Sequence, residues 1–213
     1  MIELDPAFAI TDEPALRALF PAVTSLATDK VQATLDRHAR AFIARAPFLV
    51  MGTQSADGRA DVSPRGDPAG FVRVLDDRTL AIPDRPGNNR LDSLVNILAN
   101  PGVGLMFVIP GFDETLRVNG VARLATDPAL LETMRVEGRL PRLAIVVTVR
   151  EAFLHCAKAF RRSRLWDPAQ QRDRRELPSL SRMILDQTKG APGDEEMERI
   201  DADLEEEYKR TMS

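Results

Sequence analysis

Two hydrophobic periods alternate along this chain. Between residues 48 and 156, short segments place apolar side chains at every second position, and turns rich in glycine, proline and aspartate separate them. This pattern is typical of β-strands joined by tight turns. It predicts strands at residues 48–53, 60–63, 71–75, 79–82, 103–109, 114–124 and 142–156. Short antiparallel strands with a few crossing helices favour a partly open barrel over a doubly wound parallel sheet.

The remaining segments repeat apolar residues at the three- and four-residue spacing of helices. Helices are predicted at residues 13–20, 29–45, 88–99, 127–136, 179–188 and 194–209. Capping residues support three of them, because Asp12 precedes the first, Asp127 precedes the fourth, and Asn88 or Asn89 precedes the third.

The apolar stripes of these helices predict their packing. In the first helix, Leu16, Leu19 and Phe20 are expected to pack on the body of the protein. The helix that ends near Ala99 is predicted to turn four residues inward: Leu91, Leu94, Val95 and Leu98. The last helix carries a stripe that needs cover from the body or from a second subunit: Met197, Ile200, Leu204 and Tyr208.

Two strands carry more specific expectations. Residues 103–109 are apolar almost throughout, so this strand is expected to be buried on both faces. In residues 114–124, alternation predicts that Arg117 and Asn119 face one way. Three apolar residues are expected on the opposite face: Leu116, Val118 and Val121.

Composition narrows the class of protein. The chain has 213 residues, with 44% hydrophobic and 29% charged residues, enough for one large domain with a helical appendage. A net charge of −3 argues against a nucleic-acid partner. No apolar run is long enough to span a bilayer, and the acidic N-terminal segment lacks the features of a secretory signal. A single cysteine, Cys156, fits a reducing compartment, so a cytoplasmic protein is expected.

Two cationic loops are the first candidates for chemistry. One loop contains Ser63 and Arg65, and the other contains Arg85, Asn88 and Arg90 and opens directly into a predicted helix. Arginine and the N-terminus of a helix both bind phosphate groups. On this pattern two interpretations stay open: the loops bind a phosphorylated ligand, or they are ordinary turns whose arginines are solvated.

Motifs for self-sufficient catalysis are missing from the sequence. There is no phosphate-binding P-loop, dinucleotide-binding glycine motif, zinc-ligand spacing or nucleophile elbow, and with two histidines no metal site is expected. His155 and Cys156 are adjacent, but neighbouring strand residues point to opposite faces. A cationic segment at residues 158–164 is either an anion-binding patch or a solvated turn. An enzyme of this composition would therefore need a cofactor to supply its chemistry.

The order of these motifs resembles the pyridoxamine 5′-phosphate oxidase-like flavoproteins. The resemblance covers about residues 45–168 and rests on five segments: the first hairpin with Asp57-Gly58, residues 62–67, residues 80–88, the end of the helix at Asn100-Pro101, and residues 115–120. Residues 155–166 match a subgroup whose substrate is uncharacterised. The segment from Trp166 to Ser213 departs from the true oxidases, so oxidation of vitamin B6 is not predicted.

The resemblance implies a mainly β fold with helices (α+β), a six-stranded antiparallel FMN-binding split barrel. It also implies a homodimer with FMN at the subunit interface. The chain would then divide into an N-terminal helical arm (1–45), the FMN-binding barrel (46–168) and a C-terminal helical extension (169–213). The residues that the resemblance assigns to the cofactor are Val62, Ser63, Arg65, Ile82, Pro83, Arg85, Asn88, Asn89, Arg90, Arg117, Asn119, Lys158, Arg162, Ser163 and Trp166.

Within this assignment, Val62, Ser63 and Arg65 would follow the flavin ring, and the segment from Arg85 to Arg90 would hold the phosphate. The function implied is an FMN-dependent oxidoreductase that acts on a small substrate. Two alternatives stay open, a flavin carrier or sensor without turnover and a cofactor-free dimeric scaffold.

Overall fold

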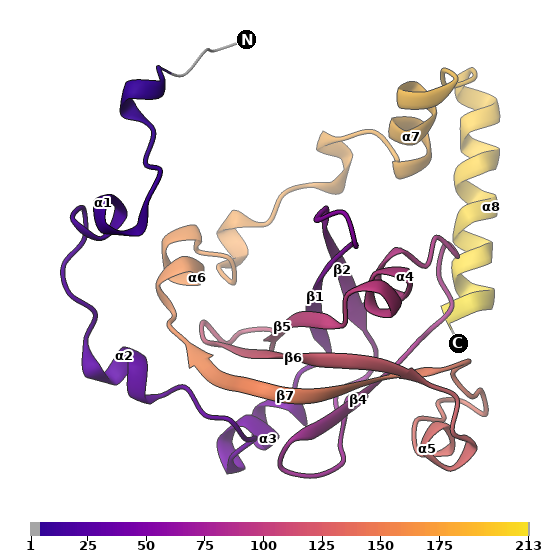
Figure 1. The fold of residues 1–213 in the computed structure, drawn as a ribbon. Coiled ribbons are helices and arrows are strands. Elements are labelled where there is room, and N and C mark those ends of the chain that lie inside the picture. Colours follow the sequence, from indigo (N-terminus) through magenta and orange to yellow (C-terminus); the bar gives the residue numbers. More distant parts are fainter. Residues whose placement is uncertain (1–4, 213) are drawn as a thin grey trace.

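Seven strands form one antiparallel sheet at the centre of the molecule (Figure 1). The structure is a computed structural model that describes residues 5–212. The strands are β1 (Phe48–Gln54), β2 (Ala60–Gly66), β3 (Arg73–Val74), β4 (Thr79–Pro83), β5 (Gly102–Val108), β6 (Thr115–Ala125) and β7 (Ala144–His155). Their order in the sheet is β2-β1-β5-β6-β7-β4-β3, with β2 and β3 as the two edges. The predicted split barrel is confirmed, and the seventh strand is the two-residue β3.

Turn chemistry explains the hairpins. Gly58 has φ +86°, the left-handed backbone that the tight turn between β1 and β2 requires and that glycine adopts without steric cost. The predicted third strand is the shortest, because only Arg73 and Val74 pair with β4. The strand predicted at residues 60–63 extends to Gly66, since β1 pairs with it along its full length.

Two expectations about strand faces are wrong. In β5, Val103, Leu105 and Phe107 are buried but Met106 is exposed, so only one face of the strand packs into the core. In β6, Val121 lies on the exposed side with Arg117, whereas Leu116, Val118 and Ala122 are buried. Strict alternation puts the odd-numbered residues of β6 on one face, so Val121 belongs with Arg117 and Asn119.

The described part of the chain contains eight α-helices. They are α1 (Glu13–Arg17), α2 (Ser25–Asp29), α3 (Arg37–Ile43), α4 (Asp92–Ala99), α5 (Pro128–Glu132), α6 (Lys158–Ser163), α7 (Leu180–Thr188) and α8 (Asp194–Met212). Single 3-10 turns lie at Pro6–Phe8, Pro168–Gln170 and Arg174–Glu176. The side chains of Asp12, Asp127 and Ser179 cap α1, α5 and α7. The helix predicted at residues 127–136 ends earlier, at Glu132.

The helix predicted at residues 29–45 is replaced by a break and a shorter helix. Gln32 exchanges two backbone hydrogen bonds with Ala152 of β7, and the N–H of Leu35 donates to the carbonyl of Asp77. These tertiary pairings take the backbone groups that a continuous helix would use. The Asp36 side chain then caps α3 by accepting from the N–H groups of His38 and Ala39.

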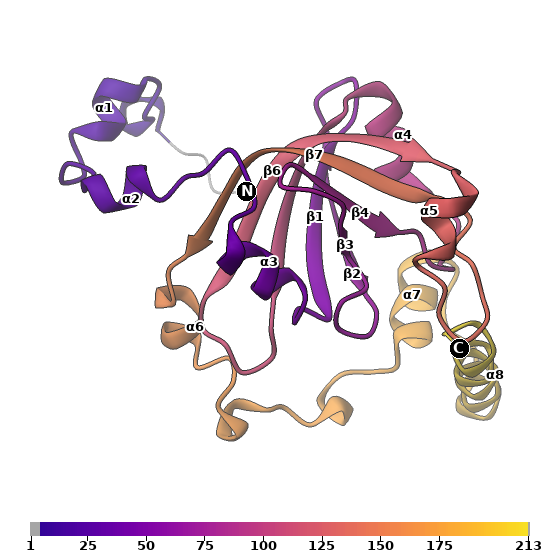
Figure 2. The same cartoon turned by 90° about the horizontal axis from the view of Figure 1, so that it is seen from below.

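Both α3 and α4 contribute to the barrel core. Ala39, Phe42 and Ile43 from α3 join Leu94 and Ile97 from α4 in the main hydrophobic cluster. Figure 2 shows α3 against the inside of the curved sheet. Of the predicted stripe of α4, only Leu94 is buried, while Leu91, Val95 and Leu98 are exposed.

Polar bonds explain the rotation of α4. The Ser93 hydroxyl donates to Asp61 at 3.0 Å, and the Asn96 amide donates to the hydroxyl of Thr53 at 3.0 Å. Ser93, Asn96 and Thr53 are all buried. Since a buried polar group without a partner is costly, these bonds turn Ser93 and Asn96 inward and the leucine stripe outward.

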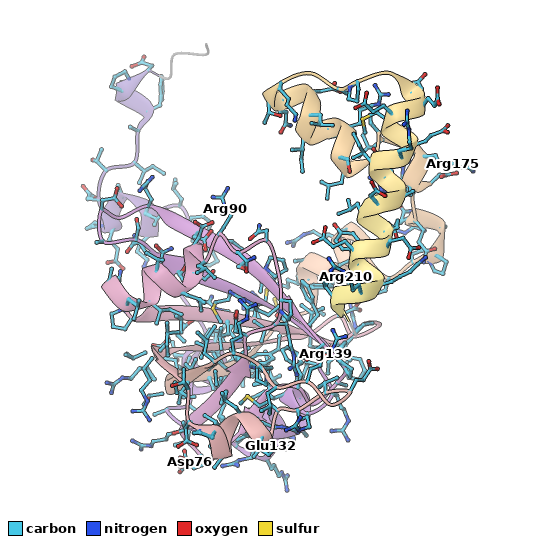
Figure 3. The ribbon with its side chains drawn as sticks, turned by 90° about the vertical axis from the view of Figure 1, so that its right-hand side faces the viewer. Asp76, Arg90, Glu132, Arg139, Arg175 and Arg210 are labelled. Atoms are coloured by element: carbon cyan, nitrogen blue, oxygen red, sulfur yellow. The ribbon has the colours of Figure 1, made fainter. Side chains whose placement is uncertain are left out.

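The two ends of the chain differ in packing. Leu16, Leu19 and Phe20 were expected on the body, but the segment that carries them extends away from the sheet, and all three are exposed (Figure 1). At the other end, α7 runs beside α8, and Met197 of the predicted stripe is buried. Arg139 joins α8 to the body through a hydrogen bond to the carbonyl of Arg210 at 3.2 Å (Figure 3).

Among residues 5–212, no helix is both long and apolar enough to cross a membrane.

The turn between β3 and β4 gives a pH prediction. The backbone N–H of Arg78 donates to Asp76 at 2.7 Å, and this bond, with a second from the hydroxyl of Thr79, lowers the pKa of Asp76 below 3.8. A carboxylate whose pKa is lowered by folding stabilises the protein above its unfolded pKa, and this contribution is lost as the pH falls through the folded pKa. We expect Asp76→Asn to lose stability relative to the parent at pH 6, and the difference to shrink below about pH 4. Thermal unfolding of both proteins across this pH range tests it, and a constant difference would contradict it.

Candidate functional site

Four charged side chains join the C-terminal end of β2 to the loop that follows β4. Arg65 Nη1 donates to Asp84 Oδ1 at 3.1 Å, and Arg85 Nε donates to Asp67 Oδ2 at 2.5 Å. The pairing is reciprocal, because each of the two segments contributes one arginine and one aspartate. We call these four residues the latch. All four side chains are largely buried, with exposed fractions of 18% for Arg65, 16% for Asp84, 24% for Arg85 and 12% for Asp67.

The latch spans the opening of the sheet. β2 is one edge strand, and β4 lies next to the other edge. Backbone hydrogen bonds between strands do not close the sheet there, so the two ion pairs link its edges through side chains instead. Arg85 is further held by a bond from Nη2 to the carbonyl of Met134 at 2.9 Å.

One donor of the latch has no acceptor. In the described part of the chain, Arg65 Nε is buried and makes no hydrogen bond. Buried N–H groups of this kind are rare in native structures, and an orphaned donor needs a partner from a ligand or from water. Arg65 therefore has a free donor for an electron-rich group placed beside the latch.

The loop between β4 and α4 holds three other predicted residues. The side chain of Asn88 accepts from the N–H of Arg90 at 3.1 Å, and Asn89 has φ +57°. Arg90 is exposed and pairs with Asp92 at 2.7 Å, and this hydrogen bond, reinforced by the charge of Asp92, raises the pKa of Arg90 above its usual value. Arg90 is thus a permanent cation at the start of α4.

The N-terminus of α4 lacks the predicted cap. Neither Asn88 nor Asn89 caps it, because Leu91 is the N-cap residue, with φ +60° and no side chain that can accept a hydrogen bond. The first N–H groups of a helix have no partner within the helix and carry the positive end of its dipole. An uncapped helix start beside Arg90 is a favourable place for an anion.

The strand β2 separates the residues predicted to line a ring. Val62 is exposed on the outside of the sheet, whereas Ser63 and Arg65 point to the inner side. Ile82 and Pro83 are buried in β4. The side chains of Val62 and Arg65 lie on opposite faces of β2, so they cannot both contact one face of a planar ligand. One of these two residues would therefore contact such a ligand only through its backbone groups.

The outer face of the sheet brings two further predicted residues together. The strand registers align one row across β2, β1, β5, β6 and β7: Pro64, Val50, Met106, Arg117 and Phe153. The next row aligns Val62, Gly52, Gly104, Asn119 and Glu151. Asn119 donates to Glu151 at 3.0 Å, and the guanidinium of Arg117 lies 5.1 Å from the centre of the Phe153 ring. We call these two rows the outer face.

The four predicted residues near α6 lie elsewhere. Lys158, Arg162 and Ser163 are exposed on α6, and the Trp166 indole donates to the carbonyl of Phe112 at 2.7 Å. Figures 1 and 2 both place α6 and α4 at opposite ends of the sheet. One copy of the chain therefore joins Arg65 to the loop before α4, but it keeps the α6 group apart from α4.

Sequence reasoning missed the acidic half of the site. Asp67 and Asp84 were not predicted as site residues, yet each holds a predicted arginine. Asp61, which accepts from Ser93 and Thr53, was missed as well. The signal was present in β2, where Asp61, Ser63 and Arg65 occupy the inner positions and apolar Val62 an outer one. This inverted alternation indicates a polar interior at this edge of the sheet.

Comparison with known proteins identifies the family. The sequence model of the pyridoxamine 5′-phosphate oxidase family matches residues 35–156, which contain the whole sheet, α3 and α4. The chain therefore belongs to the pyridoxamine 5′-phosphate oxidase family. No curated protein matches the sequence.

Solved structures show distant likeness to the barrel. HupZ of Group A Streptococcus is 22% identical, covers 56% of this chain and 92% of its own, and has a TM-score of 0.45. An FMN-binding protein of Syntrophomonas wolfei is 9% identical, covers 55% and 88%, and has a TM-score of 0.42. HutZ, the heme storage protein of Vibrio cholerae, is 14% identical, covers 56% and 94%, and has a TM-score of 0.40. Likeness at this level assigns no ligand.

Proposed function

We propose that this protein is a homodimeric FMN-dependent oxidoreductase that acts on a small molecule. The observation that carries the proposal is that β2 and α4 each hold donors without a partner: the buried Arg65 Nε in β2, and the uncapped start of α4 beside Arg90. Ser93 of α4 bonds to Asp61 of β2, and both elements lie in the region that matches the family. FMN has an electron-rich ring edge and a phosphate, and both kinds of group accept hydrogen bonds from donors such as these. FMN supplies hydride or electron transfer when bound.

The residues of the chain would hold the cofactor at two points. Arg65 would donate its free N–H to the ring edge and favour negative charge there. Arg90, Asn88 and the first N–H groups of α4 would hold the phosphate. Arg85 contributes indirectly, because its bonds to Asp67 and Met134 fix the position of the loop.

A second copy of the chain would complete the site. The outer face exposes apolar side chains of Val62, Met106 and Pro64, and it carries Arg117 and Asn119. Figures 1 and 2 place α6, with its predicted residues, at the opposite end of the sheet from α4 in the same copy. A dimer formed through the outer face would cover its apolar side chains and supply these residues from the partner.

A flavin carrier or sensor is a second candidate. The carboxylates nearest to the loops already have partners, since Asp67 and Asp84 are held in ion pairs and Asp61 accepts from Ser93. No group among them is thereby left poised as a general acid or base. Such a protein would hold FMN without rapid turnover.

The visible absorption spectrum of the purified protein tests the proposal. We expect a yellow protein with flavin absorption, and mass spectrometry of the released cofactor should identify FMN. Rapid reduction by NADH or NADPH, followed by reoxidation by an acceptor, would favour the oxidoreductase over the carrier. A colourless protein that takes up no added FMN would refute both.

The variant Arg90→Ala tests the phosphate site. Loss of one charged contact to phosphate is expected to weaken FMN binding by about tenfold or more. Arg90 is exposed, so the fold should be retained. Arg59→Ala is the matched control, because Arg59 is also an exposed arginine paired with a nearby aspartate, in the turn between β1 and β2. Equal FMN affinity in both variants would place the phosphate elsewhere.

A further inference from the structure

The N-terminal segment of the described chain contacts almost nothing. Every residue from Asp5 to Asp29 is exposed, and none of the helices within it buries a residue. Seven large apolar side chains in this segment have exposed fractions between 44% and 86%: Phe8, Ile10, Leu16, Leu19, Phe20, Val23 and Leu26. We call residues 5–29 the arm. Figures 1 and 2 show it extending away from the sheet.

The arm has structure that it cannot stabilise alone. Asp12 caps α1 and Asp5 caps the first 3-10 turn, yet α1 and α2 have five residues each. Isolated helices of this length are marginal in water, and helices in proteins gain most of their stability by packing an apolar face. The apolar residues of the arm therefore need a surface that the same copy does not provide.

The C-terminal end of the arm lies at the rim of the outer face. Lys30, the next residue, donates to the carbonyl of Leu154 at 2.9 Å, and its ammonium lies 5.4 Å from the centre of the Phe153 ring. Phe153 also contacts Arg117 of the outer face. Because the arm is tethered at this rim and extends away from its own sheet, a partner that covers the outer face would lie within its reach.

We propose that the arm packs on a second copy of this chain and forms part of the dimer interface. The inference rests on the dimer of the proposed function. A stable interface buries roughly 800 Å² on each partner, and seven exposed apolar side chains supply surface of that order. Each copy carries both an arm and an outer face, so in a two-fold dimer each arm would pack on the outer face of the other copy.

Charge favours the outer face over the C-terminal helix as the receiving surface. The arm carries Asp5, Asp12, Glu13 and Asp29 against Arg17. The outer face presents Arg117, and Arg123 lies beyond it on the exposed side of β6, against one acidic residue, Glu151. The helix α8, by contrast, begins with three acidic residues. Opposite charges across an interface select this partner surface and disfavour the acidic helix.

Photo-crosslinking of the full chain tests the inference. A benzophenone amino acid replaces Phe20, and the control variant carries it in place of Leu177, which has the same exposed fraction of 64%. Irradiation of the Phe20 variant is expected to give a species of twice the 23.6 kDa chain mass, crosslinked to the outer face of the partner. A crosslink within one chain, or a dimer without a crosslink from position 20, would overturn the inference.

Two further measurements separate the inference from the proposed function. Leu19→Asp and Phe20→Asp change residues that are exposed in a single copy, so the barrel should fold as before. We expect each to weaken dimerisation by at least about tenfold in analytical ultracentrifugation, with Leu177→Asp unchanged. If both arm variants stayed yellow and dimerised as tightly as the parent, the role of the arm would be refuted and the proposed function would stand. A monomeric parent protein would refute the proposed dimer and the arm contact together.

Discussion

The variant Gly120→Ala is expected to disrupt the pairing of β6 with β7 and to destabilise the folded protein strongly. A Cβ atom at this position would lie 2.8 Å from Val147 Cγ1 and closer still to the carbonyl oxygen of Thr148. Gly120 sits where the register between the two strands shifts, so the β7 backbone approaches it directly. Because the nearest obstacle is backbone, rotation of a side chain cannot relieve the clash.

The expected loss is about 3 kcal/mol or more of the free energy of unfolding, at the high end for overpacking a core. Denaturation in urea, followed by circular dichroism, measures it. Gly102→Ala is the matched control, because a Cβ there would lie 3.5 Å from the side chain of Asn100, an ordinary contact. Equal stability of the two variants would show that the strands can separate locally, and it would contradict the tight approach at Gly120.

Removing one aspartate of the latch is the second large perturbation. Asp84→Ala would leave the guanidinium of Arg65 without its carboxylate, in a site where its Nε already has no acceptor. Breaking a buried ion pair by removing one partner leaves an uncompensated charge. Since some water reaches both side chains, we expect a loss of about 2–3 kcal/mol in the free energy of unfolding.

A double variant that lacks both charges separates the ion pair itself from the cost of leaving one charge unpaired. Arg65→Met with Asp84→Leu removes both charges, so the double variant is expected to recover part of the stability lost in Asp84→Ala. Glu132→Ala removes an exposed ion pair with Arg135, and its unfolding transition should be unchanged within error. If Asp84→Ala behaved like Glu132→Ala, the latch would not link the two edges of the sheet. Under the proposed function, Asp84→Ala should also weaken FMN binding, because Asp84 no longer orients the guanidinium of Arg65.

Local signals in the sequence predicted much of the fold. Asp12 and Asp127 cap the helices for which they were predicted, because a side-chain cap involves residues two or three positions apart. The hairpin turn at Gly58 was predicted for the same reason, since its chemistry lies within four residues. The segments that resemble the flavoprotein family fall within the region matched by the family.

Distant contacts account for the errors. The helix expected at residues 29–45 is interrupted because Gln32 pairs with Ala152 and Leu35 with Asp77. The face that α4 buries is set by bonds from Ser93 to Asp61 and from Asn96 to Thr53. The spacing of apolar residues along one segment contains no information about partners in another strand.

By itself, the sequence determined most strands, the hairpin turn at Gly58, the helix caps Asp12 and Asp127 and the two arginine-bearing segments of this protein, because each depends on neighbouring residues. The tertiary structure alone decided how those segments pair, since Arg65 meets an aspartate 19 positions away and Arg85 one 18 positions away. It also decided that the N-terminal arm lies free of its own sheet. The physical reason is that packing depends on residues distant in the chain: the latch partners become neighbours only when the sheet curves, and no part of the sheet covers the apolar residues of the arm.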